Sequence, residues 1–169
     1  DCKTVYVLSD ETIDNRHFHQ AVQEAARCFP LPVYLNGKKC TTFDPADRSG
    51  HTRTVMGFRL FEINATSRYG YRSRVNFYGH LIPITGNPTE NGQGSPVIEY
   101  RCVYAEPTGE ATEIRPVLPD RKALVENEAK QDFVRECRKF LFECIQHDER
   151  SHDLSWRDWQ EAKDLGRPG

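Results

Sequence analysis

The chain has 169 residues, of which 37% are hydrophobic and 28% charged, and its formal net charge is −2. This length suffices for one domain of ordinary size. The nearly neutral charge gives no overall field that would draw the chain to nucleic acid or to an anionic membrane, so such binding would need a local patch. No apolar run approaches the roughly 20 residues that span a bilayer, and we expect no membrane partner.

The first half of the chain is expected to contain one helix among short strands. Residues 4–8 read as a strand, and Asp14 or Asn15 is then placed to cap a helix whose apolar residues recur at helical spacing as far as Phe29. Asn36-Gly37 predicts a tight hairpin within residues 33–43. The stretches "RTVMGFRLFEI", residues 53–63, and "RVNFYGHLIPI", residues 74–84, each read as a single strand.

The second half is expected to add two strands and then two helices. A polar loop occupies residues 85–96, and strands are predicted at residues 97–105 and 112–118. A long amphipathic helix follows from about residue 122 to residue 147, and Ser155 and Asp158 form a capping box for a short final helix. Helices at both ends of a run of strands predict an α+β fold, with a mostly antiparallel sheet and helices packed on one face.

The six cysteines are interpreted as reduced, structural residues, which indicates a cytoplasmic protein. Cys28, Cys137 and Cys144 fall on the apolar faces of predicted helices. Cys137 and Cys144 share a face but lie two turns apart, roughly 10.5 Å along the axis. That pair alone cannot hold one metal ion, and no metal site is predicted.

The common local motifs of self-sufficient enzymes are missing. The sequence contains no CxxC, HExxH, GxSxG or GxxxxGK[ST] pattern. Whether the chain takes part in catalysis must therefore be argued from other residues.

Two cations stand out in "VLPDRKALVEN", residues 117–127. Arg121 and Lys122 lie between a predicted strand and the predicted start of the long helix, where cations oppose the helix dipole. The same position has a chemical use, because a helix N-terminus and two cations together form a binding site for a terminal phosphate. The alternative, that both are simply solvated loop cations, stays open at this point.

A second candidate surface has arginines interleaved with aromatic residues. Such interleaving can bind nucleic acid by stacking and phosphate contacts, and it is also typical of a half-exposed strand. The residues of this possible interaction face are Arg68, Arg72, Arg74 and Tyr78.

Two passages resemble the second domain of GHKL-type ATPases, the class of gyrase B, MutL-type and histidine-kinase-like proteins. They are "HFHQAVQEAARCFPLPVYLNGKKC", residues 17–40, and "EIRPVLPDRKALVEN", residues 113–127, which is followed by a long helix. In that family the second domain is called the transducer and has a ribosomal-protein-like α/β fold. Its loop lysine contacts the γ-phosphate of ATP, which the preceding domain binds together with Mg²⁺.

The resemblance implies that residues 1–10 are the last strand of a preceding ATP-binding domain, residues 11–148 a transducer-like domain, and residues 149–169 a short helix and tail. In the MutL-type pattern the lysine follows the proline by two positions, where this chain has Arg121. The resemblance therefore leaves the lysine's role open between Arg121 and Lys122; we assign it to Lys122, with Arg121 as its neighbour.

This chain lacks the family's glycine-rich DxGxG motif and the asparagine-bearing helix that binds magnesium. On this interpretation the isolated chain is a fragment that is inactive alone and needs the preceding ATP-binding domain as its partner. The alternative is a stand-alone module that binds protein or nucleic acid without catalysis, for which salt-sensitive binding is expected.

Overall fold

The computed structural model describes residues 15–47, 49–64, 73–84, 98, 101–147 and 154–166. The strand predicted at residues 4–8 and the loop predicted at residues 85–96 lie outside these residues.

The described part of the chain contains three helices and seven strands. The helices are α1 (Asn15–Arg27), α3 (Glu128–Gln146) and α4 (Trp156–Asp164). The strands are β1 (Tyr34–Leu35), β2 (Lys38–Lys39), β3 (Ser49–Val55), β4 (Phe58–Asn64), β5 (Arg74–Phe77), β6 (His80–Pro83) and β7 (Arg101–Pro107).

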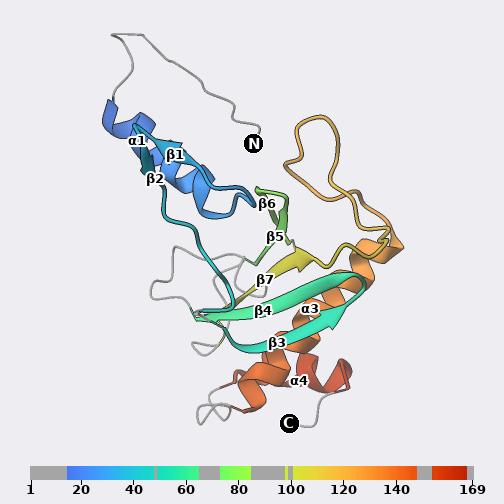
Figure 1. The fold of residues 1–169 in the computed structure, drawn as a ribbon. Coiled ribbons are helices and arrows are strands. Elements are labelled where there is room, and N and C mark those ends of the chain that lie inside the picture. The colour runs from blue at the N-terminus through green and yellow to red at the C-terminus, as the bar shows by residue number, and fades with distance from the viewer. Residues whose placement is uncertain are drawn as a thin grey trace.

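Five of the strands form one sheet in the order β3-β4-β7-β5-β6, and β1 and β2 form a separate two-stranded sheet. Within the larger sheet only the β5–β7 pair is parallel. Figure 1 shows the long helix α3 running along this sheet. The predicted α+β class with a mostly antiparallel sheet is therefore confirmed.

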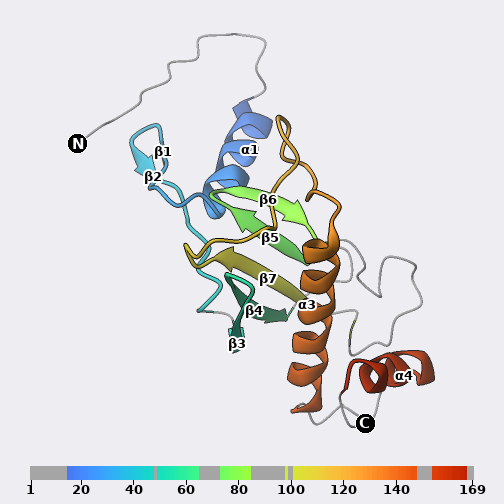
Figure 2. The ribbon, with the colours of Figure 1, turned by 90° about the vertical axis from the view of Figure 1, so that its right-hand side faces the viewer.

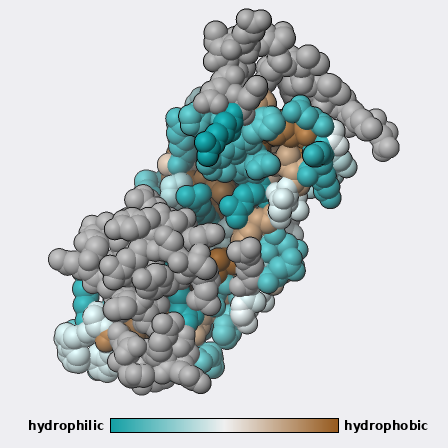
Figure 3. All heavy atoms as spheres, turned by 90° about the vertical axis from the view of Figure 1, so that its left-hand side faces the viewer, coloured by the Kyte–Doolittle hydropathy of each residue, from teal (hydrophilic) through white to brown (hydrophobic). Residues whose placement is uncertain are grey.

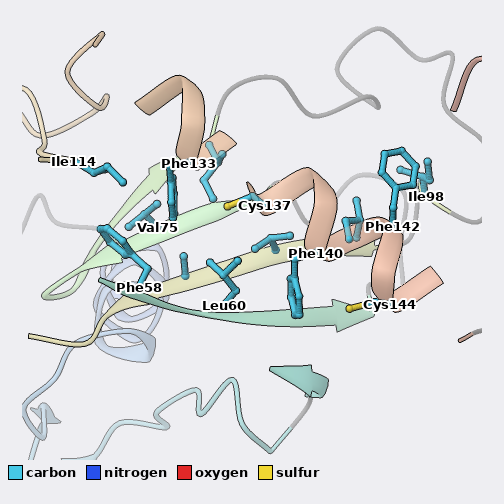
Figure 4. Close-up of a cluster of buried hydrophobic side chains, with 14 of the residues drawn as sticks. Phe58, Leu60, Val75, Ile98, Ile114, Phe133, Cys137, Phe140, Phe142 and Cys144 are labelled. Atoms are coloured by element: carbon cyan, nitrogen blue, oxygen red, sulfur yellow. The ribbon is translucent and has the colours of Figure 1, made fainter. Parts of the chain in front are cut away.

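The main core lies between this sheet and α3, which crosses one face of it (Figure 2). Successive side chains of a strand point to opposite faces, so Phe58, Leu60 and Glu62 of β4 turn toward α3 while Phe61 and Ile63 turn away. Figure 4 shows the apolar side chains of α3, among them Phe133, standing over these strands. Helix α4 joins the same core through buried Ala162.

The opposite face of the sheet is covered in part by the segment that begins at the end of α1. Cys28 and Phe43 pack against a smaller buried cluster on that face, and the side-chain amide of Asn76 donates a hydrogen bond to the Cys28 carbonyl, at 2.9 Å. Among the described residues seen from this side, most of the surface is hydrophilic, with some hydrophobic surface exposed (Figure 3).

Several sequence predictions are confirmed. Helix α1 begins at Asn15, and the hairpin of β1 and β2 turns at Asn36-Gly37, whose φ angles are 49° and 78°. The side chain of Ser155 caps α4 by accepting a hydrogen bond from the Asp158 N–H.

The cysteines also match their predicted role in the part of the chain that the structure describes. Five of them are free thiols, and Cys40, Cys102, Cys137 and Cys144 are buried. Burial is the main cause that raises the pKa of Cys102 and of Cys144 to about 12 in each case.

The two segments predicted as single long strands are hairpins instead. Residues 53–63 fold back at Met56-Gly57, with φ angles of 51° and 79°, and residues 74–84 fold back at Tyr78-Gly79, with φ angles of 50° and 95°. Two successive left-handed residues match the right-handed twist of the strands they join. The prediction missed these turns because Met and Tyr are unusual at the first position.

The predicted boundaries around α3 were also wrong. The helix begins at Glu128 rather than near residue 122, because the Asn127 side chain caps it by accepting the Lys130 N–H. Residues 112–118 form no strand and make one isolated bridge, between Pro116 and Leu124. The preceding strand, predicted at residues 97–105, is described as β7 from Arg101 to Pro107.

None of the described helices is both long enough and apolar enough to cross a membrane.

Candidate functional site

The segment of residues 115–125, called here the cation loop, is held by its own backbone. The Val117 N–H donates to the Ala123 carbonyl and the Val125 N–H donates to the Arg115 carbonyl, each at 2.8 Å. The Arg121 N–H closes the tip by donating to the Val117 carbonyl, also at 2.8 Å. These hydrogen bonds fix the path of the loop in the absence of a regular strand or helix.

Both ends of the cation loop are anchored in the main core. Ile114 is 1% exposed and Leu124 is 2% exposed, and both belong to the cluster under α3. The Asn127 side-chain amide adds a hydrogen bond to the Glu113 carbonyl, at 3.4 Å. Figures 1 and 2 both show the loop projecting from the sheet beyond the N-terminal end of α3.

The tip of the cation loop presents Arg121 and Lys122 to solvent. Among the residues that the structure describes, neither side chain makes an ion pair. The Asp120 carboxylate accepts the backbone N–H of Lys122, at 3.4 Å, rather than its ammonium group. With Arg115, the loop carries three cations and one acid in a chain whose net charge is −2.

Apolar side chains lie exposed beside these cations. Leu118 is 70% exposed and Val117 is 39% exposed. A loop that is rigid at its base and exposes both apolar and cationic side chains at its tip is suited to contact another surface.

The backbone of Arg121 is left-handed, with φ at 53°. For a residue with a side chain this conformation costs roughly 1–2 kcal/mol. Such strained positions are found preferentially at functional sites, where the surrounding structure holds them. Here the hydrogen bond from the Arg121 N–H to the Val117 carbonyl holds it.

The helix start assumed in the sequence argument for this site was wrong. Lys122 lies five positions before Asn127, the residue that caps α3, and the cap already accepts an N–H of the first turn. The helix start is therefore not next to the two cations in the sequence. A joint anion site of the helix N-terminus with Arg121 and Lys122 stays a prediction.

The second predicted surface is described only in part, because Arg68 and Arg72 lie outside the described residues. Tyr78 is 68% exposed at the turn between β5 and β6. Arg74 is half-buried and lines a cavity on the sheet face that α3 does not cover. Of the predicted interaction face, the structure therefore describes Arg74 and Tyr78.

That cavity has a volume of about 420 Å³, within the range of small-molecule sites. It lies between the end of α1 and the sheet, and its lining includes Arg27, Cys28, Phe43, Arg74 and Tyr104. Burial, reinforced by the Cys28 thiol, raises the pKa of the Tyr104 hydroxyl, which therefore stays protonated. No local sequence pattern indicates this cavity, because its lining comes from distant segments.

Comparison with known proteins supplies no relative for this chain: no family model, no curated protein and no solved structure matches it.

Proposed function

We propose that this chain is a transducer-like module of a GHKL-type ATPase. In this proposal the cation loop delivers Lys122, with Arg121 beside it, to the γ-phosphate of an ATP molecule that a preceding domain binds together with Mg²⁺. The observation that carries the proposal is the loop's construction. It is anchored by Ile114 and Leu124, fixed by backbone hydrogen bonds, and exposes both cations, neither of which makes an ion pair in the described part of the chain.

The chemical role of these cations is electrostatic. Negative charge spreads over the terminal phosphate oxygens during phosphoryl transfer, and a positioned cation stabilises that charge most where water is excluded. The exposed Val117 and Leu118 side chains lie in the same loop and could bury apolar surface against the nucleotide-binding domain.

The same contact couples nucleotide state to domain position. A cation that binds the γ-phosphate loses its partner when that phosphate leaves, so the loop favours one domain arrangement only with ATP bound. Because α3 follows the loop directly and packs along the sheet, a movement of the loop is transmitted to the whole domain.

Lys122→Ala in the complete protein is expected to lower ATP turnover by about 100-fold, the typical loss when one preorganised charge-stabilising donor is removed. The variant's free energy of unfolding should stay within about 0.5 kcal/mol of the parent's, because Lys122 is exposed. The measurements are steady-state ATP hydrolysis and chemical denaturation.

Lys39→Ala is the matched control, because Lys39 is an exposed lysine on the separate hairpin of β1 and β2. The Lys39→Ala variant should hydrolyse ATP at the parent's rate. Arg121→Ala tests the neighbouring cation. Normal turnover in both Lys122→Ala and Arg121→Ala would end the proposal.

A further inference from the structure

Three side chains with different metal-binding atoms converge at the C-terminal end of α3. They are His51 of β3, Glu62 of β4 and Cys144 of α3, called here the three-donor cluster. One imidazole nitrogen, one carboxylate oxygen and the thiol sulfur all lie within 4.8 Å of one another. The cluster is at the end of α3 that is farther from the cation loop (Figures 1 and 2).

The fold brings these residues together through a turn and a helix face. The Met56-Gly57 turn folds β3 back along β4, and the pairs Thr52–Phe61 and Ser49–Ile63 bring His51 beside Glu62. The register shifts between Ser49 and Thr52, and irregularities of this kind often redirect a side chain near a functional site.

Cys144 is supplied by the buried face of α3. It is 2% exposed, and it lies over the end of β4 in Figure 4, well apart from Cys137. Glu62 points to the same side of the sheet as Phe58 and Leu60, which is the side that α3 covers.

The separation of the donor atoms suits a tetrahedral ion. His51 Nδ1 and Glu62 Oε2 are 3.6 Å apart. Two ligands at about 2.0–2.3 Å from one tetrahedral Zn²⁺ lie roughly 3.3–3.8 Å apart. Sub-ångström side-chain movements would therefore bring these two atoms to a shared ion, and the sulfur lies within about one further ångström.

The carboxylate of Glu62 is already oriented for this role. Its Oε1 accepts a hydrogen bond from the buried Arg101 guanidinium, and its Oε2 is the oxygen that faces His51. A hydrogen-bonded partner that fixes a ligating carboxylate is a regular feature of protein metal sites. The His51 side chain is 44% exposed, so an ion can reach the cluster from solvent.

We propose that His51 Nδ1, Glu62 Oε2 and Cys144 Sγ bind one divalent transition-metal ion, with water in the fourth position. An imidazole, a thiolate and a carboxylate together suit Zn²⁺ best. On binding, the S–H proton of Cys144 passes to solvent and the sulfur forms the bond to the metal. The ion ties β3 and β4 to the end of α3, independently of any role of the cation loop.

The test is a titration of the metal-free, reduced full chain with Co²⁺, which reports thiolate ligation through an intense near-ultraviolet absorption band. One equivalent of Co²⁺ should produce the band, and added Zn²⁺ should displace it. Cys144→Ala should lose the band. His51→Gln should weaken Co²⁺ binding by about tenfold or more, because even outer-shell changes cost that much.

Cys137→Ala is the matched control, because Cys137 is a buried thiol on the same helix two turns earlier and should leave the titration unchanged. His51 is half-exposed, so His51→Gln stays informative if Cys144→Ala does not fold. The proposal is overturned if the parent chain gives no band, if the band survives in Cys144→Ala, or if His51→Gln binds Co²⁺ like the parent.

Discussion

Arg101→Leu is expected to lower the free energy of unfolding by about 3–5 kcal/mol, the typical loss when one partner of a buried ion pair is removed. The side chains of Arg101 and Glu62 are 6% and 3% exposed, and the guanidinium donates to the Glu62 carboxylate. Without Arg101, the Glu62 carboxylate would stay buried without its cation. Chemical denaturation in the presence of a chelator measures the effect free of any bound metal.

A double-mutant cycle makes this prediction sharper. In Glu62→Leu/Arg101→Leu neither charge of this pair remains, so the double variant should be clearly more stable than Arg101→Leu alone. Arg59→Leu is the control on the same strand as Glu62, because Arg59 is exposed and its loss should cost no more than about 0.5 kcal/mol. If the double variant loses as much free energy of unfolding as the two single variants together, the assignment of Arg101 and Glu62 as a buried ion pair is contradicted.

Phe58→Ala is expected to lower the free energy of unfolding by about 3–5 kcal/mol, because truncating a buried phenylalanine leaves a cavity. Phe58 is 0% exposed, and its ring lies 4.8 Å from that of Phe133 and 5.6 Å from that of Phe77, centroid to centroid. It therefore joins β4, β5 and α3. Thermal and chemical unfolding would both report the loss.

Leu118→Ala serves as the comparison for Phe58→Ala. It also removes an apolar side chain, but one that is 70% exposed at the tip of the cation loop. The free energy of unfolding of Leu118→Ala should stay within about 0.5 kcal/mol of the parent's. Equal losses of unfolding free energy in the two variants would contradict the assignment of Phe58 to the core.

The sequence was sufficient for elements with a strong local signal. The apolar spacing before Phe29 located α1, Asn36-Gly37 located the first hairpin, and Ser155 with Asp158 located α4. In each case the residues that determine the element are neighbours, so no tertiary contact had to be known.

Turns with unusual residues were missed. Met56 and Tyr78 take left-handed conformations that their side chains disfavour. At Gly79 an added Cβ would lie 2.4 Å from Phe29 Cδ2, so a contact with a distant segment requires glycine there. Asn127 was a signal that could have been used, because asparagine is among the preferred caps.

The candidate sites also divide into those with a local sequence signal and those that depend on contacts between distant segments. Arg121 and Lys122 could be proposed because they are adjacent in the sequence, although the helix expected to begin beside them begins at Glu128. His51, Glu62 and Cys144 were not found, because the pairing of β3 with β4 must be known before the first two become neighbours. Cys144 was assigned to the core on its helix face, which is correct for its burial but does not reveal what lies opposite.

The most direct test of the proposed function is the rate at which the Lys122 amine is acetylated in the complete protein, read by mass spectrometry. The account predicts slower acetylation of Lys122 with a non-hydrolysable ATP analogue than with ADP or without nucleotide, while exposed Lys38 reacts equally in all three states. Equal rates at Lys122 in the three states would contradict a contact between the cation loop and the γ-phosphate.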